Sequence, residues 1–103
     1  MSILKDILKD EKERLSILQV QLENQIAVLA KGSLSKKKRG EHWYFYLAYR
    51  EGARVIFKYV GKENSLQVNS LNEEIRKRKK LELKLQNIKN DLKDIVRGLG
   101  ERQ

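Results

Sequence analysis

Apolar residues follow a helical spacing at both ends of this chain and alternate along short segments in its middle. Near the start, leucines recur every seven residues, a heptad repeat typical of a helix that packs along one seam. The pattern predicts a helix over residues 1–31, with Glu11 and Gln25 interrupting its seam, and a second helix over residues 65–97. The leucines of the first seam are Leu8, Leu15, Leu22 and Leu29. The second seam comprises Leu71, Ile75, Leu81, Leu85, Ile88, Leu92 and Ile95.

The segment between the helices, residues 42–60, is rich in aromatic and β-branched residues, which suit strands. Arg50, Glu51 and Gly52 interrupt it, and glycine can adopt the left-handed conformation that closes a three-residue loop. We therefore expect a two-stranded antiparallel hairpin. Its expected pairs are Tyr49 with Ala53, Leu47 with Val55, Phe45 with Phe57 and Trp43 with Tyr59.

This register places the paired residues on one face, because side chains alternate along a strand. An isolated hairpin needs packing on one face, so we expect the Trp43 face to lie on the helices. A two-residue Glu51–Gly52 loop would instead bring charged side chains beside Trp43. We prefer the first register because it separates apolar from charged residues. The face left over then carries Tyr44, Tyr46, Arg54 and Lys58.

Together these segments predict an α+β fold: two long, antiparallel, coiled-coil-like helices with one two-stranded antiparallel hairpin between them. The expected layout is a single domain over residues 1–103, with a basic loop over residues 32–41 before the hairpin. An alternative packing pairs the helix seams with those of a second chain, which would give a homodimer.

The net charge of +9 is concentrated in the middle of the chain. Residues 31–80 carry 14 basic and 5 acidic side chains, which accounts for the whole excess. Such a concentration favours a polyanionic partner, above all nucleic acid. Antiparallel helices would bring the basic run at 36–39 close to the basic run at 76–80 and form one patch. Each run alone is also compatible with an ordinary solvated surface.

Rings beside cations are typical of nucleic-acid surfaces, because rings stack on bases and cations neutralise phosphates. Tyrosine is also simply a good strand residue, and Lys or Arg commonly protect sheet edges. The candidate nucleic-acid-binding residues are Lys36, Lys37, Lys38, Arg39, Tyr44, Tyr46, Arg54, Lys58, Arg76, Lys77, Arg78, Lys79 and Lys80.

Catalytic chemistry is not expected from this sequence. It contains no cysteine, and its one histidine, His42, lacks a partner for a metal site. Its glycines are isolated and form no phosphate-binding loop. We expect neither a metal nor another cofactor. The sequence also has no apolar run that could span a bilayer and no signal-peptide pattern, so we expect a cytoplasmic protein without a membrane partner.

The central motifs resemble an uncharacterised prokaryotic family of short proteins. The resemblance lies in the segment Lys31–Leu34, the Tyr-rich strand and Arg-Glu-Gly turn of Tyr44–Arg54, Lys58–Lys62, and Arg78–Leu81. It covers about residues 31–85. Ala53 stands where such families often have a second glycine, and relatives with cysteines before the hairpin suggest a metal site that this chain lacks. The resemblance implies a helix–hairpin–helix arrangement and a prokaryotic or mobile-element origin, and it assigns no activity.

We therefore expect a small non-enzymatic protein that binds DNA or RNA largely independently of sequence. The alternative is a protein-interaction module from a phage or mobile element that inhibits a nucleic-acid-processing defence enzyme, in the manner of an anti-CRISPR protein. Its partner would be a nucleoprotein. A purely structural coiled-coil adaptor is a third possibility.

Overall fold

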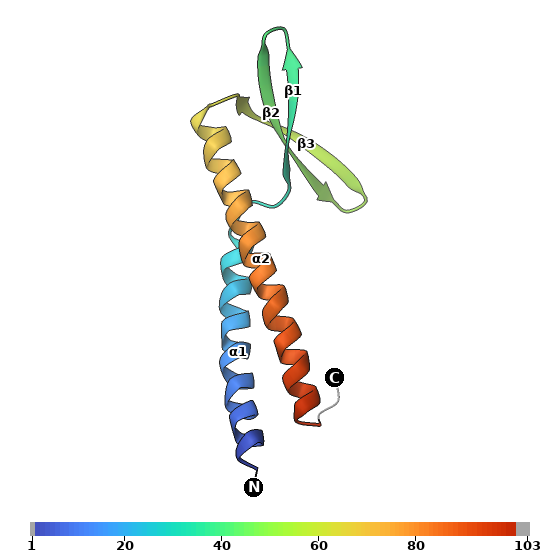
Figure 1. The fold of residues 1–103 in the computed structure, drawn as a ribbon. Helices are drawn as coiled ribbons and strands as arrows, with labels where there is room; N and C mark the ends of the chain where they lie inside the picture. The colour runs from blue at the N-terminus through green and yellow to red at the C-terminus, as the bar shows by residue number, and fades with distance from the viewer. Residues whose placement is uncertain (1, 101–103) are drawn as a thin grey trace. The chain divides into compact units, whose positions relative to one another are not determined.

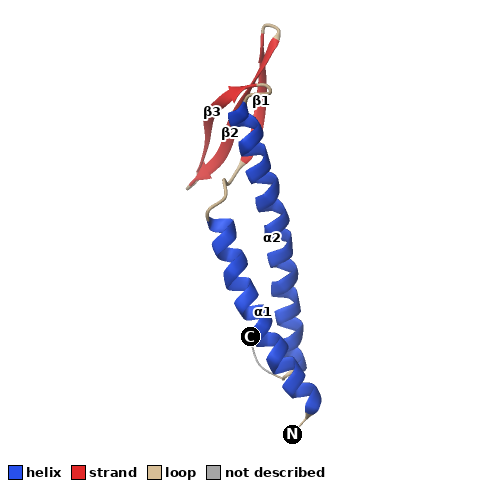
Figure 2. Ribbon diagram, turned by 90° about the vertical axis from the view of Figure 1, so that its left-hand side faces the viewer, coloured by secondary structure: helices blue, strands red, loops and turns tan. Residues whose placement is uncertain are grey.

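The computed structural model describes residues 2–100, in which one helix precedes and one helix follows an antiparallel sheet along the chain (Figures 1 and 2). It is an α+β fold, as expected, with a helix–sheet–helix order. Residues 1 and 101–103 of the expected single domain lie outside the described range. The elements are α1 (Ile3–Ala27), β1 (Ser33–Arg39), β2 (His42–Glu51), β3 (Arg54–Lys62) and α2 (Leu66–Gly98).

The sheet has three strands in the order β1-β2-β3, so the expectation of a two-stranded hairpin was wrong. The additional strand, Ser33–Arg39, lies where a basic loop was expected over residues 32–41. It pairs antiparallel with β2 and thereby satisfies backbone groups of β2 that β3 does not reach. Its consecutive cations do not prevent strand formation, because an edge strand tolerates and even benefits from lysines.

The chain divides into two compact units. The helical unit comprises the chain up to Val28 together with the chain from Lys80 onward. The sheet unit comprises Leu29–Lys79 and so contains all three strands and the first part of α2.

In the helical unit, α1 and the second part of α2 pack antiparallel along the seams that the sequence indicated. Leu15 and Leu22 of α1 are buried against Ile88 and Ile95 of α2. Leu8 lies beside Gly98, so the start of α1 is next to the end of α2 (Figure 1). The partly buried side chains that pack around this core are Leu8, Leu18, Leu81, Leu85, Leu92 and Leu99.

The seam of α1 is interrupted at Glu11, whose charge is balanced within the same helix. Arg14 lies one turn further along, and its Nε donates a hydrogen bond of 3.1 Å to Oε2 of Glu11. This hydrogen bond from Arg14 lowers the pKa of Glu11 below its ordinary value. The carboxylate is therefore accommodated at the seam without a partner from α2.

The β2–β3 turn has two residues, Gly52 and Ala53, and both registers considered from the sequence were wrong. Gly52 has φ of +63°, whereas Ala53 is not among the described residues with positive φ. This combination is typical of a type II′ turn, which requires glycine at its first loop position. The observed pairs include Glu51 with Arg54, Tyr49 with Ile56, Leu47 with Lys58, and Tyr46 with Tyr59.

A β-bulge interrupts the pairing at Val60. Tyr46 pairs with Tyr59 and the preceding Phe45 pairs with Gly61, which leaves Val60 as the extra residue on β3. A Cβ at Gly61 would lie 2.7 Å from Oγ of Ser65 and 3.5 Å from Cγ2 of Val68. The first turn of α2 therefore lies against the side of the sheet to which Phe45 points.

The start of α2 is capped by a serine. Oγ of Ser65 accepts a hydrogen bond of 3.3 Å from the backbone N–H of Val68. This is the N-cap arrangement, and it places the helix start at the earlier of the two serines in this segment. Gly61 leaves room for the capping hydroxyl, because any side chain at that position would collide with it.

The close approach of Gly32 to β2 allows a test of the unexpected strand β1. Its φ is +123°, and an added Cβ would lie 2.4 Å from the carbonyl oxygen of Ala48 in β2. Gly40, in the β1–β2 turn, also has positive φ but has nothing within 4 Å of such a Cβ. We expect Gly40→Ala to cost about 1 kcal/mol of unfolding free energy from backbone strain alone. Gly32→Ala should cost at least about 2 kcal/mol more, because overpacking adds to the same strain.

Urea unfolding followed by the fluorescence of Trp43 measures both variants. Equal losses of stability would show that the approach of Gly32 to β2 is not the constraint described here.

Candidate nucleic-acid interface

The strand register sorts the sheet residues onto two faces, because directly paired residues point to the same side. We call the face that contains Tyr44 and Tyr46 the aromatic face, and the opposite one the Trp43 face. The aromatic face carries Ser33, Ser35, Lys37, Arg39, His42, Tyr44, Tyr46, Ala48, Arg50, Val55, Phe57, Tyr59 and Lys62. The Trp43 face carries Leu34, Lys36, Lys38, Trp43, Phe45, Leu47, Tyr49, Glu51, Arg54, Ile56, Lys58 and Gly61.

The aromatic face is open along β3. Val55, Phe57 and Tyr59 are 51%, 56% and 55% exposed. The apolar residues of the Trp43 face are at least half-buried, as are Tyr44, Tyr46 and Ala48 of the aromatic face, and the Trp43 side meets α2 at Gly61. Soluble domains rarely leave neighbouring large apolar side chains uncovered without a use for them, so this face is the candidate interaction surface.

Two tyrosines of the aromatic face, Tyr44 and Tyr46, lie beside Tyr59. Its ring centroid is 5.5 Å from that of Tyr46, at 69° between the ring planes, and 6.4 Å from that of Tyr44, at 43°. None of these rings stacks flat on another. With Arg39 they line a shallow pocket of about 370 Å³. The tyrosines therefore keep ring surface available in a depression bounded by a guanidinium.

Positive charge lies directly beside the rings. Nζ of Lys37 is 5.4 Å from the centroid of Tyr46 and 5.8 Å from that of Phe57. A cation–π contact at an exposed site contributes only about 0.5–1 kcal/mol, so an incoming anion can draw this lysine away from the rings. The cations of this face are Lys37, Arg39, Arg50 and Lys62, and none of its strand residues within the described chain is Asp or Glu.

The sheet divides the candidate residues that the sequence had grouped together. Tyr44 and Tyr46 do share a face, and Lys37 and Arg39 join them. Lys36 and Lys38 lie on the other side, over Trp43, with Nζ at 4.7 Å and 5.9 Å from its ring centroid.

Two further candidates lie on the side opposite to the expected one. Arg54 and Lys58 were expected beside the tyrosines, but both belong to the Trp43 face. The difference follows from the two-residue turn, because a shift of register by an odd number of residues exchanges the faces of a strand.

The basic run of α2 does not merge with the run in β1. Arg78 is half-buried, and its guanidinium donates a hydrogen bond of 2.8 Å to the backbone oxygen of Leu29. Oε1 of Glu74 accepts one of 3.3 Å from the N–H of Ala30. This part of α2 therefore lies beside the chain that enters β1, whereas β1 extends for roughly 20 Å to its basic end.

The other cations of the α2 run have a different placement from Arg78. Arg76, Lys77 and Lys79 are exposed within the sheet unit. Lys80 is exposed as well but belongs to the helical unit. These side chains form a separate basic surface on α2, and Arg78 has a structural role.

Sequence reasoning missed Phe57, Tyr59 and Lys62 as part of the tyrosine-bearing face. The signal that could have found Phe57 and Tyr59 is the order Gly52-Ala53, since glycine at the first loop position favours a two-residue type II′ turn. Lys62 reaches the same face only because of the bulge at Val60. No residue pattern in this segment marks that bulge.

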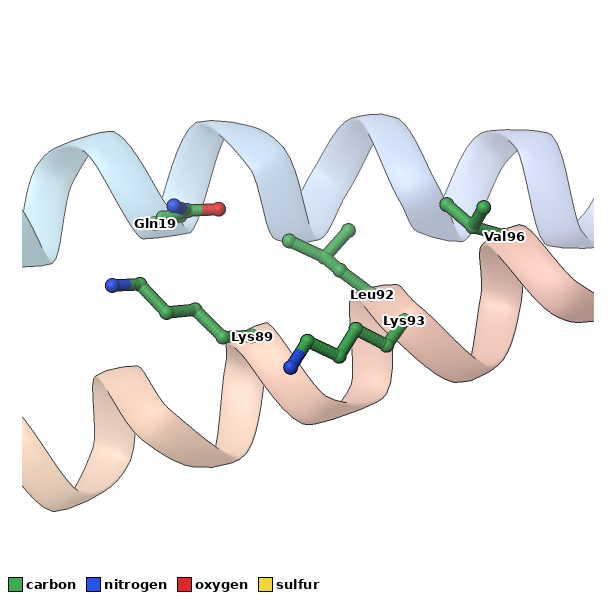
Figure 3. Close-up of a pocket in the computed structure, with 5 residues that line it drawn as sticks. All are labelled: Gln19, Lys89, Leu92, Lys93 and Val96. Atoms are coloured by element: carbon green, nitrogen blue, oxygen red, sulfur yellow. The ribbon is translucent and has the colours of Figure 1, made fainter. Parts of the chain in front are cut away.

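Other sites offer less chemistry. Within residues 2–100 no group of three or more His, Cys, Asp or Glu could hold a metal ion, and no helix there is long and apolar enough to cross a membrane. A shallow pocket of about 240 Å³ lies along the helical unit (Figure 3). It is lined by Gln19, Lys89, Leu92, Lys93 and Val96. This set contains no carboxylate, histidine, serine or cysteine.

Comparison with known proteins gives a family for this chain. Residues 8–77 match the family described as a domain of unknown function (DUF6788). The chain belongs to this family. The match extends over most of α1, the whole sheet and the first part of α2, and so includes the aromatic face. No curated protein and no solved structure matches the chain.

The structural role of Arg78 gives a test that separates it from its exposed neighbours. Arg78→Ala removes the hydrogen bond to Leu29, and we expect a loss of about 1 kcal/mol of unfolding free energy, discounted for its partial exposure. Lys77→Ala, which removes an equal charge from an exposed position, should change stability by less than about 0.5 kcal/mol. Thermal unfolding followed by circular dichroism measures both. A smaller loss for Arg78→Ala than for Lys77→Ala would contradict this role.

Proposed function

We propose that this protein is a small, non-enzymatic nucleic-acid-binding protein that binds through the aromatic face of its sheet. One observation carries the proposal: exposed aromatic rings and cations share a face on which no strand residue is acidic. Rings contribute contacts with bases that tolerate any sequence, and cations contribute contacts with phosphates. An ordinary solvated sheet face has no need to expose Phe57 and Tyr59 by more than half.

In this proposal Lys37, Arg39, Arg50 and Lys62 contact phosphates. The exposed α2 residues Arg76, Lys77 and Lys79 raise the positive potential of the same unit and attract the ligand. Sequence preference is weak, because phosphate contacts carry no sequence information and the stacking of bases on rings is tolerant of base identity.

A protein-interaction module remains the second candidate, and one observation favours it. The outer face of α1 exposes Ile17 and Val20 by 55% and 58%, and these residues line a shallow depression of about 460 Å³. In this version a protein of prokaryotic or mobile-element origin would hold a nucleoprotein enzyme in the cytoplasm and inhibit it. A homodimer would use the same outer face, because the seams of α1 and α2 already bury each other within the chain.

Salt dependence of binding tests the first candidate. Fluorescence anisotropy of labelled single-stranded DNA, duplex DNA and RNA should show binding that weakens steeply as salt increases. The triple variant Lys37→Ala/Arg39→Ala/Lys62→Ala removes three expected phosphate contacts. For a single strand, its slope of log K against log salt should be shallower by about 2, since each contact contributes roughly 0.7.

The matched control is Lys9→Ala/Lys84→Ala/Lys93→Ala, which removes the same charge from exposed positions of the helical unit. We expect its salt slope to equal that of the unmodified protein. Equal losses in both triple variants would show that overall charge, and not the aromatic face, determines binding. An absence of binding to all three nucleic acids at low salt would reject the proposal and favour the protein-interaction module.

A further inference from the structure

We infer that the aromatic face takes an unpaired strand of nucleic acid, with bases stacked on Tyr44, Tyr46, Phe57 and Tyr59 and one base seated in the pocket beside Arg39. This inference rests on the proposed function and specifies the form of its ligand. A duplex binds poorly on this face, and a strand without bases reaches the cations but cannot stack on the rings.

The arrangement of the rings selects for separated bases. The centroid of Tyr59 is 5.5 Å from that of Tyr46 and 6.4 Å from that of Tyr44. Successive bases of a duplex strand are only about 3.4 Å apart along the axis. A strand that places neighbouring bases on neighbouring rings must therefore be extended and unstacked. A duplex keeps its base faces covered and presents only its backbone and groove edges to a flat sheet.

The pocket provides a place for one whole base. Its volume of about 370 Å³ is at the lower end of the range for small-molecule sites. Tyrosine rings form its lining, and Arg39 adds a planar guanidinium that can stack on a base or form two hydrogen bonds with its edge or with a phosphate. The two depressions on the helices, of about 240 and 460 Å³, have no aromatic residue in their lining.

Lys37 links the stacking surface to the backbone of the ligand. Its Nζ lies over Tyr46 and Phe57. A base that stacks on either ring displaces the ammonium group toward solvent, where the phosphate of the same nucleotide lies. The lysine thereby exchanges a weak contact with a ring for a charge-assisted hydrogen bond. Stacking and charge neutralisation are coupled at this residue.

The experiment compares four ligands of equal length by fluorescence anisotropy at low salt. They are oligothymidylate, oligouridylate, an abasic deoxyribose-phosphate strand and a blunt DNA duplex. A length of about 16 nucleotides or base pairs covers the upper end of the site sizes known for sheet-based single-strand binders. We expect at least one of the two single strands with bases to bind about tenfold or more tighter than the abasic strand and the duplex. The ranking of thymidylate and uridylate then shows whether DNA or RNA is preferred.

Two variants, one on each face of the sheet, test whether the rings of the aromatic face cause this difference in affinity. Phe57→Leu/Tyr59→Leu keeps apolar side chains and charge but removes two ring faces, so it should weaken single-strand binding about tenfold or more without changing the salt slope. Trp43→Leu removes an aromatic ring from the opposite face of β2 and should retain the affinity. Circular dichroism confirms that each variant is folded.

The outcomes separate this inference from the proposed function. Equal binding of duplex, abasic strand and single strands, combined with full affinity of Phe57→Leu/Tyr59→Leu, would overturn the inference but leave a phosphate-binding protein. A complete absence of binding would overturn both. Because the ligand comparison uses the unmodified protein, the inference stays testable even if the leucine variant does not fold.

Discussion

The alternation of side chains along a strand is the constraint on which the candidate site depends. Each side chain of β2 points to one of the two faces of the sheet. Because β2 is the central strand, the face that each of its residues takes determines which residues of β1 and β3 lie beside it. One side meets the first turn of α2 at Gly61 and takes Trp43, Phe45 and Leu47. The other side takes the half-buried Tyr44 and Tyr46 together with the more exposed Phe57 and Tyr59 of β3.

The helices were predictable because their signal is periodic and redundant. Leucine and isoleucine recur along both seams, so one polar residue within a seam, such as Glu11, does not obscure the helical spacing. The seams bury each other as the spacing indicated. The end of α1 was less predictable: the helix ends at Ala27, whereas the spacing predicted that it would continue to residue 31. Beyond the helix, Gly32 allows the chain to pass close to β2 at the start of β1.

The sheet was predicted only in part, because its register depends on one turn and one bulge. The argument from the sequence assumed that apolar and charged residues would separate between the faces. Both faces, however, are partly exposed and carry cations, so burial does not enforce that separation. Arg54 and Lys58 were consequently assigned to the wrong face. The third strand was missed because the run of cations in β1 lacks the apolar alternation that usually identifies a strand.

The bulge at Val60 has a consequence for the cap of α2. It allows β3 to present Tyr59 to the aromatic face and, two residues later, Gly61 to the helix, which a regular strand cannot do. If β3 paired regularly through this point, Val60 would stand opposite Phe45 and Gly61 opposite Tyr44. The side chain of Val60 would then lie where Ser65 caps the helix. The extra residue therefore keeps a position without a side chain at the start of α2.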